Sequence, residues 1–148
     1  MQLHDATLLK TQALIDGRWS DADSGRSFAV TDPADGAEIG RVPAMSTGET
    51  ERAIAAAAAA LPAWRARTAK DRATVLKRWF ELIMAAQEDL AMLMTAEQGK
   101  PLAEARGEVA YGAAFIEWFA EEAKRVYGDV IPEPVAGKRI IVTKEPSG

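Results

Sequence analysis

The 148-residue chain contains no cysteine and no asparagine, and His4 is its one histidine. Without thiols the chain has neither disulfides nor a thiolate nucleophile, and a single histidine cannot build a histidine-based metal site. No apolar run approaches the roughly 20 residues that a membrane-spanning helix needs, and the first ten residues lack the basic and then apolar pattern of a signal peptide. We therefore expect a cytoplasmic chain without membrane contacts, in which His4 is a solvated residue near a frayed end.

The charged residues lack a stripe of one sign. The 18 basic and 22 acidic side chains are interspersed and give a net charge of −4, so the electrostatic footprint of a nucleic-acid-binding protein is missing. A content of 48% hydrophobic and 27% charged residues is typical of one globular domain. Nucleic acids are not expected partners.

The first part of the chain predicts two β-hairpins, within residues 13–43. Asp16-Gly17 supplies the positive φ angles of a tight turn between two short extended segments. A second group of turn residues, at positions 32–36, separates another pair of extended segments. Two small hairpins need other elements to cover their apolar faces.

Three long helices are predicted next. Ser46 and Glu49 have the spacing of a capping box, and Pro62 is expected to kink or end the helix that they open. Gly99 ends the second helix, whose apolar residues recur at spacings of three and four. The predicted ranges are about 46–66, 68–98 and 101–127.

The third helix carries two non-polar faces. One is a seam expected to face the core: Leu102, Ala105, Val109, Gly112, Ile116, Phe119, Ala123 and Val126. The other combines aromatic residues and carboxylates: Glu108, Tyr111, Phe115, Trp118 and Glu122. We expect this helix to be covered on both sides. A glycine inside a helix costs about 1 kcal/mol relative to alanine, so Gly107 and Gly112 suggest that something passes close to the backbone.

The last 14 residues change character. Residues 139–144 form a β-branched run typical of a strand, but only turn residues follow it. We interpret residues 135–148 as the first half of a hairpin whose partner strand is missing, and residues 1–134 as the main unit.

Several motifs in one order carry a family resemblance: Leu14-Ile15-Asp16-Gly17-Arg18-Trp19, the segment from Phe28 to Gly36, and Glu97-Gln98-Gly99-Lys100-Pro101. Together with the third helix they resemble the aldehyde dehydrogenase superfamily, most closely its succinate-semialdehyde dehydrogenase branch. The resemblance implies an α/β fold, with residues 1–134 as the amino-terminal part of the NAD(P)-binding domain. It also implies that residues 135–148 start an oligomerisation hairpin, and that the complete protein is a homo-oligomer, either a dimer or a tetramer.

The resemblance implies NAD or NADP as cofactor and a small-molecule aldehyde, succinate semialdehyde or a related compound, as substrate. Members of this family oxidise the aldehyde to the carboxylic acid through a cysteine nucleophile, with an asparagine that stabilises the oxyanion. This chain has neither residue type, so we expect no catalytic and no cofactor-binding residue in it. As a fragment on its own it is expected to be inactive.

The resemblance also assigns candidate site residues. Tyr111 and Phe115 match the wall of the family's substrate tunnel, with Glu108 and Trp118 as weaker candidates. From the residues alone, an aromatic stripe at helical spacing is more often core packing, and that alternative stays open. Thr31, through its carbonyl oxygen, and Glu97, through its carboxylate, match positions that bind a monovalent cation in some members.

Two other functions are open at this point. The chain could be a non-catalytic helical interaction module derived from the family, which lacks the catalytic residues altogether. It could also be a small enzyme that uses the carboxylates of Glu104 and Glu108, which lie four residues apart on one helical face. The second is the weaker idea, because paired glutamates on a helix are usually solvated and no cluster of metal ligands accompanies them.

Overall fold

The computed structural model describes residues 1–146 of the chain. Its elements in order are the 3-10 turn η1 (Ala6–Leu8), strands β1 (Ala13–Ile15), β2 (Arg18–Ser20), β3 (Ser27–Thr31) and β4 (Glu38–Pro43), helices α1 (Thr47–Ala66), α2 (Ala69–Ala85), α3 (Gln87–Gln98) and α4 (Leu102–Glu122), and strands β5 (Asp129–Ile131) and β6 (Ile140–Val142).

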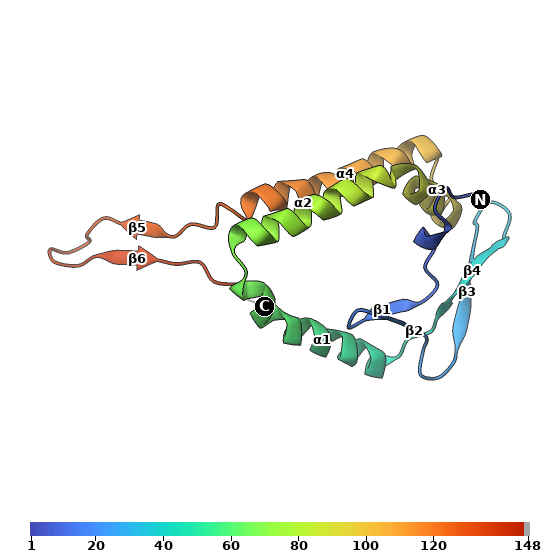
Figure 1. Ribbon diagram of the computed structural model, residues 1–148, viewed down its shortest axis with the longest axis horizontal. Coiled ribbons are helices and arrows are strands. Elements are labelled where there is room, and N and C mark those ends of the chain that lie inside the picture. Colours follow the sequence, from blue (N-terminus) through green and yellow to red (C-terminus); the bar gives the residue numbers. More distant parts are fainter. Residues whose placement is uncertain (147–148) are drawn as a thin grey trace.

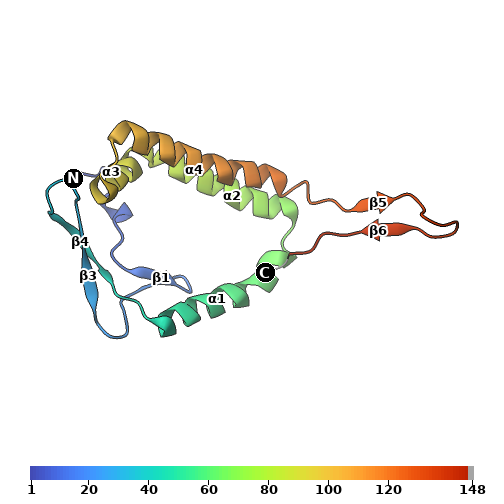
Figure 2. The same ribbon diagram turned by 180° about the vertical axis from the view of Figure 1, so that it is seen from behind.

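The elements form an open frame (Figures 1 and 2). Helices α2 and α4 run side by side, and α1 diverges from them at the turn before α2. Helix α3 and the β3–β4 hairpin lie at one end of the α2–α4 pair, and the β5–β6 hairpin projects from the other end. Helices α2, α3 and α4 therefore pack against one another, whereas α1 contacts strand β1.

Both predicted hairpins within residues 13–43 are confirmed. Strands β1 and β2 pair antiparallel across Asp16 and Gly17, which have φ angles of 50° and 72°, as a two-residue hairpin turn requires. Strands β3 and β4 pair from Ser27 opposite Pro43 to Thr31 opposite Glu38, with a register irregularity between Val30 and Thr31. Such an irregularity interrupts the regular ladder of backbone hydrogen bonds.

The first predicted helix is confirmed, and Pro62 lies inside α1 without ending it. The second is wrong as one element, because Ala86 ends α2 and caps α3 with φ −99° and ψ 12°. No glycine or proline marks the break. Its physical reason is tertiary: the Gln87 amide Nε2 donates to the carbonyl of Arg106 at 3.0 Å, which fixes α3 against α4.

The third predicted helix ends at Glu122, five residues before its predicted end. Its buried side is built from small residues: Ala105, Val109, Ala113 and Ala120. The predicted seam is therefore right at Ala105 and Val109 and wrong at Phe119 and Val126, whose side chains are 57% and 59% exposed. Small side chains let α2 approach α4 closely, which pushes the large ones to the rim of the contact.

The last predicted strand exists, but the interpretation of a missing partner strand is wrong. Strand β6 pairs antiparallel with β5, which precedes it in the chain, with Val130 opposite Ile141. The base of this hairpin needs Gly128, because a Cβ atom there would clash with the Val142 carbonyl oxygen. The three-residue β5 is separated from the end of α4 by residues 123–128 and is followed closely by two prolines, so its sequence resembles a connector.

Among the residues that the structure describes, no helix combines the length and apolar character needed to cross a bilayer.

Candidate substrate wall and cation corner

An aromatic stripe lies exposed along α4. The exposed fractions of Tyr111, Phe115 and Trp118 are 67%, 49% and 64%. The rings of Tyr111 and Phe115 meet edge to face, with centroids 4.9 Å apart and an interplanar angle of 86°, a preferred geometry for aromatic pairs. With Ala114 and Phe119 these residues line a shallow hollow of about 310 Å³. The structure thus brings three of the four predicted wall residues together on one face.

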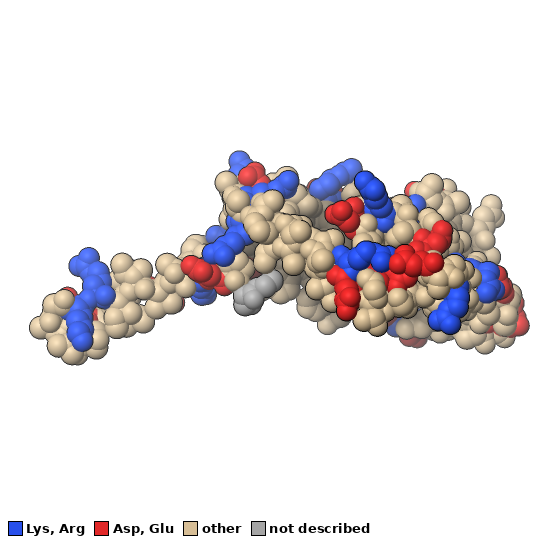
Figure 3. Space-filling view, turned by 90° about the horizontal axis from the view of Figure 1, so that it is seen from below, with Lys and Arg blue, Asp and Glu red and all other residues tan. Residues whose placement is uncertain are grey.

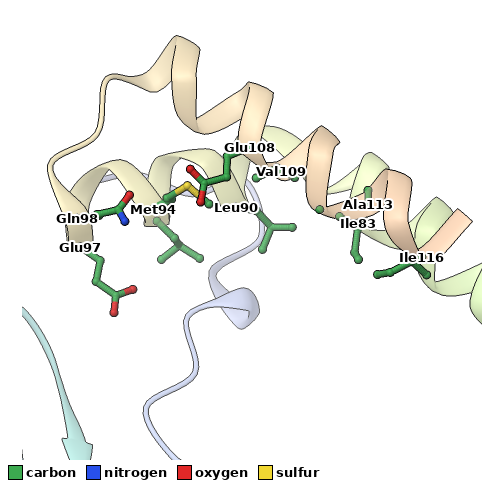
Figure 4. Close-up of a pocket in the computed structure, with 11 residues that line it drawn as sticks. Ile83, Leu90, Met94, Glu97, Gln98, Glu108, Val109, Ala113 and Ile116 are labelled. Carbon is green, nitrogen blue, oxygen red and sulfur yellow. The ribbon is translucent and has the colours of Figure 1, made fainter. Parts of the chain in front are cut away.

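Glu108, the fourth candidate, lies in a different place. It forms an ion pair with Lys100 and borders a larger hollow of about 930 Å³ between α3 and α4. In Figure 4, the side chains of Ile83, Val109, Ala113 and Ile116 follow α2 and α4, whereas Glu97, Gln98 and Glu108 lie at the α3 end. Glu108 therefore belongs to the polar rim of this apolar groove and not to the aromatic stripe.

The two helical glycines do not mark a close approach between elements of this chain. A Cβ atom at Gly107 or Gly112 would meet no atom within 4 Å. Gly112 instead lines the groove between α3 and α4. Its missing side chain widens that groove.

Thr31 and Glu97 lie on elements that meet at a corner. Gly99, with φ 77°, ends α3, and a Cβ atom there would lie 2.9 Å from Cγ of Pro33 in the β3–β4 turn. Glu97 and Val30 border the same small hollow of about 100 Å³. Residues 1–146 hold no group of three histidine, aspartate or glutamate side chains that could bind a metal ion. Glu97 supplies one carboxylate at this corner, and carboxylate oxygens are hard donors of the kind that bind cations.

Two buried carboxylates organise the chain away from the aromatic stripe. Glu49 is 2% exposed and accepts hydrogen bonds from the amides of Asp23 and Ser46, both at 2.9 Å, and from the Ser46 hydroxyl. These donors lower the pKa of Glu49 to about 2, with the Ser46 hydroxyl as the largest cause. The capping-box spacing had indicated Glu49.

The second buried carboxylate, Asp89, was missed. It is 5% exposed and accepts hydrogen bonds from the amides of His4 and Asp5, both at 2.8 Å. These backbone donors are the main cause of its lowered pKa. The expectation of a frayed end at His4 is therefore wrong for the backbone, although the His4 side chain is 84% exposed. No local pattern pairs residues 84 positions apart, so this contact cannot be predicted from the sequence.

Acidic and basic side chains intermingle on the face seen in Figure 3. Some described ion pairs join different elements, such as Arg106 with Glu88 at 2.7 Å, and others join residues three apart in the sequence, such as Arg78 with Glu81 at 3.4 Å. Opposite charges therefore pair locally in the described part of the chain.

Comparison with known proteins connects this geometry to one family. The model of the aldehyde dehydrogenase family matches residues 19–148. The chain is 64% identical over all 148 residues to glutarate-semialdehyde dehydrogenase of Pseudomonas putida and 60% identical to the NADP(+) succinate-semialdehyde dehydrogenase of Escherichia coli. It spans 31% of the length of each of these curated relatives.

The solved structure of succinate-semialdehyde dehydrogenase from Burkholderia pseudomallei superposes on the whole chain with a TM-score of 0.96 at 57% identity, and the chain covers 31% of that structure. The aldehyde dehydrogenase-like α/β fold is therefore confirmed. The chain belongs to the aldehyde dehydrogenase family.

Proposed function

We propose that this chain is the amino-terminal part of an NAD(P)-dependent semialdehyde dehydrogenase, which oxidises succinate semialdehyde or a close homologue to the carboxylic acid. One observation carries the proposal: the chain is at least 60% identical over its full length to two semialdehyde dehydrogenases. NAD(P) supplies the hydride acceptor when bound. In this proposal the nucleophile and the cofactor site come from other segments of the protein, and the present chain contributes part of the substrate wall.

The test is nucleotide reduction by the complete protein that carries this segment. Succinate and glutarate semialdehyde are compared with butanal and pentanal, uncharged aldehydes of the same lengths, each with NAD and with NADP. We expect higher kcat/KM for the semialdehydes. The 148-residue chain alone should give no turnover, because it has no thiol to attack the carbonyl carbon. Absence of turnover by the complete protein would instead favour the non-catalytic helical interaction module.

The aromatic stripe of Tyr111, Phe115 and Trp118 is proposed as the part of the substrate passage that this chain supplies. Its exposure supports the proposal, since rings that only filled a core within this chain would be buried. Glu108 is not included in this passage wall. It borders the neighbouring groove, where its carboxylate pairs with Lys100.

The corner between α3 and the β3–β4 turn is proposed to bind a monovalent cation through the Thr31 carbonyl oxygen and the Glu97 carboxylate. The bulge at Val30 and Thr31 supports this, because a bulge frees backbone groups from the strand ladder. Replacing choline chloride in the buffer with KCl should raise the melting temperature of the complete protein. Glu97→Gln should abolish that rise while Glu104→Gln, an exposed carboxylate on α4, keeps it.

The β5–β6 hairpin is proposed as a contact between copies in a homo-oligomer, a dimer or tetramer. Val130 and Ile141 face each other across the two strands and are 74% and 67% exposed. An apolar pair of this kind on a projecting hairpin can be covered by another chain. Changing both residues to threonine keeps β propensity and should lower the sedimentation coefficient of the complete protein; an unchanged value would exclude this contact.

A further inference from the structure

We propose that residues 4–11 form a strap that clamps the β3–β4 hairpin onto α3, and that Asp89 is the positioning residue that anchors this strap. The inference rests on the proposed function in one respect only: the strap is proposed to fix the surroundings of Glu97, the proposed cation ligand.

The anchor is specific. Each carboxylate oxygen of Asp89 accepts one backbone hydrogen bond. Oδ1 accepts from the His4 amide and Oδ2 from the Asp5 amide, each at 2.8 Å. The Nδ1 atom of His4 lies 3.1 Å from the same Oδ1. A carboxylate that is 5% exposed and has two backbone donors fixes the direction of the peptide that supplies them. Asp5 in turn accepts from the Thr7 amide at 2.9 Å and shapes the turn η1 that follows.

Beyond η1 the strap reaches the β3–β4 hairpin. Thr11 lies against Gly40 of β4, where an added Cβ atom would be 3.4 Å from its Cγ2. Leu9, Lys10 and Thr11 border the same hollow as Val30, Ile39, Gly40, Val42, Leu93 and Glu97. The Lys10 ammonium lies 5.2 Å from the centre of the Trp19 ring in β2. The strap therefore contacts both hairpins while it is anchored on α3.

The clamp spans the length of α3. Asp89 lies in the first turn of this helix and Glu97 in its last turn, about 12 Å apart at the helical rise of 1.5 Å per residue. The strap crosses this distance and ends beside Glu97. Without it, the hairpin would keep only its direct contacts with α3, which include residues of β3 and the close approach of Pro33 to Gly99. Loss of the anchor should therefore loosen the corner without touching Glu97 itself.

Asp89→Asn tests the anchor in the complete protein. Asparagine keeps one acceptor but turns an NH₂ donor toward the second backbone amide, so one of the two hydrogen bonds is lost. Glu88→Gln is the matched control, because Glu88 is the neighbouring carboxylate of the same turn and pairs with Arg106 instead of the strap. If Asp89→Asn does not fold, deletion of residues 1–5 removes the donors and leaves α3 intact.

Hydrogen exchange measured by mass spectrometry is the first readout. In Asp89→Asn, amides in residues 4–11 and 38–43 should exchange on the order of tenfold faster than in the wild type, as expected for loss of a hydrogen bond to a charged acceptor. The exchange rates of amides in α1 should stay at the wild-type values. In Glu88→Gln, the exchange rates of all amides should stay at the wild-type values. Faster exchange confined to residues 4–11 would overturn the clamp.

The rise in melting temperature on exchange of choline chloride for KCl is the second readout. It should be reduced in Asp89→Asn and absent in Glu97→Gln. A full rise in Asp89→Asn, together with its loss in Glu97→Gln, would overturn the positioning role. A rise that persists in Glu97→Gln would overturn the cation corner alone, and hydrogen exchange would still decide whether the strap exists.

Discussion

Phe115 is the residue at which the two interpretations of the aromatic stripe separate. Its side chain is 49% exposed in this chain. If it lines a passage in the complete protein, its removal should lower the free energy of unfolding by less than about 2 kcal/mol. As part of a passage wall, Phe115→Ala should change the ratio of kcat/KM between short and bulky aldehydes. Steady-state kinetics and a denaturation curve measure the two effects.

Phe80→Ala is the control, because Phe80 is a half-buried phenylalanine on α2 that does not border the aromatic hollow. It should lower stability and leave the selectivity ratio unchanged. Truncation of a buried phenylalanine costs about 3 to 5 kcal/mol. A stability loss in this range for Phe115→Ala, with unchanged selectivity, would indicate that Phe115 is a core residue of the complete protein.

Glu49 makes stability depend on pH at the start of α1. Its pKa is lowered from 4.5 to about 2 in the folded state, so the unfolded chain binds a proton at higher pH than the folded chain does. The contribution of Glu49 is therefore complete above about pH 4.5 and is lost as the pH falls toward 2.

In urea denaturation of the complete protein, Glu49→Gln should be clearly less stable than the wild type at pH 6, and this difference should shrink at pH 3. Glu51→Gln, at an exposed neighbouring position of the same helix, should differ little from the wild type at either pH. A stability difference for Glu49→Gln that is the same at both pH values would contradict the role assigned to the carboxylate.

At the scale of the elements, the β5–β6 hairpin depends on one glycine. An alanine at Gly128 would clash with the Val142 carbonyl oxygen and would place its Cβ 3.1 Å from the carbonyl carbon. Because both atoms belong to the backbone, the strands must separate at their base. Gly128→Ala should therefore speed amide exchange in residues 129–131 and 140–142 while α2 and α4 keep their protection.

Gly112→Ala is the matched control for that substitution. A Cβ atom at this helical position meets nothing within 4 Å in this chain, so alanine should raise helix stability by up to about 1 kcal/mol. In the complete protein, a destabilising Gly112→Ala would reveal a segment that packs into the groove between α3 and α4. If Gly128→Ala leaves amide exchange in residues 129–131 and 140–142 unaltered, the backbone at Gly128 can shift without loss of strand pairing.

At the scale of the whole molecule, the buried core is small and leaves many large apolar side chains exposed. The buried apolar residues in the described part are six alanines and one valine, whereas Trp79 and Phe119 are 55% and 57% exposed. The isolated chain should bind a hydrophobic dye strongly, because its large apolar side chains are exposed. It should unfold in a broad transition, because too little apolar surface is packed to make unfolding cooperative. Fluorescence titration and calorimetry of the 148-residue chain measure these properties. A sharp transition of a monomer would favour the self-contained helical module.

Local chemistry in the sequence determined the elements whose signals lie within a few residues. Asp16-Gly17 fixed the first hairpin turn, because its two positive φ angles need no distant partner. The capping box of Ser46 and Glu49 fixed the start of α1, and Gly99 fixed the end of α3. The colinear motifs also identified the family. The position of Tyr111, Phe115 and Trp118 on one helical face followed from their spacing.

Only the tertiary structure decided the features that join distant residues. The break at Ala86 has no local breaker and follows from the docking of α3 on α4. Strand β5 is too short to be recognised without its partner β6. The choice of Ala113 and Ala120 over Phe119 for the buried side of α4 depends on how closely α2 approaches. The Asp89 anchor links residues 84 and 85 positions apart. Periodicity reports which residues share a face, but which face is covered depends on the element that packs there.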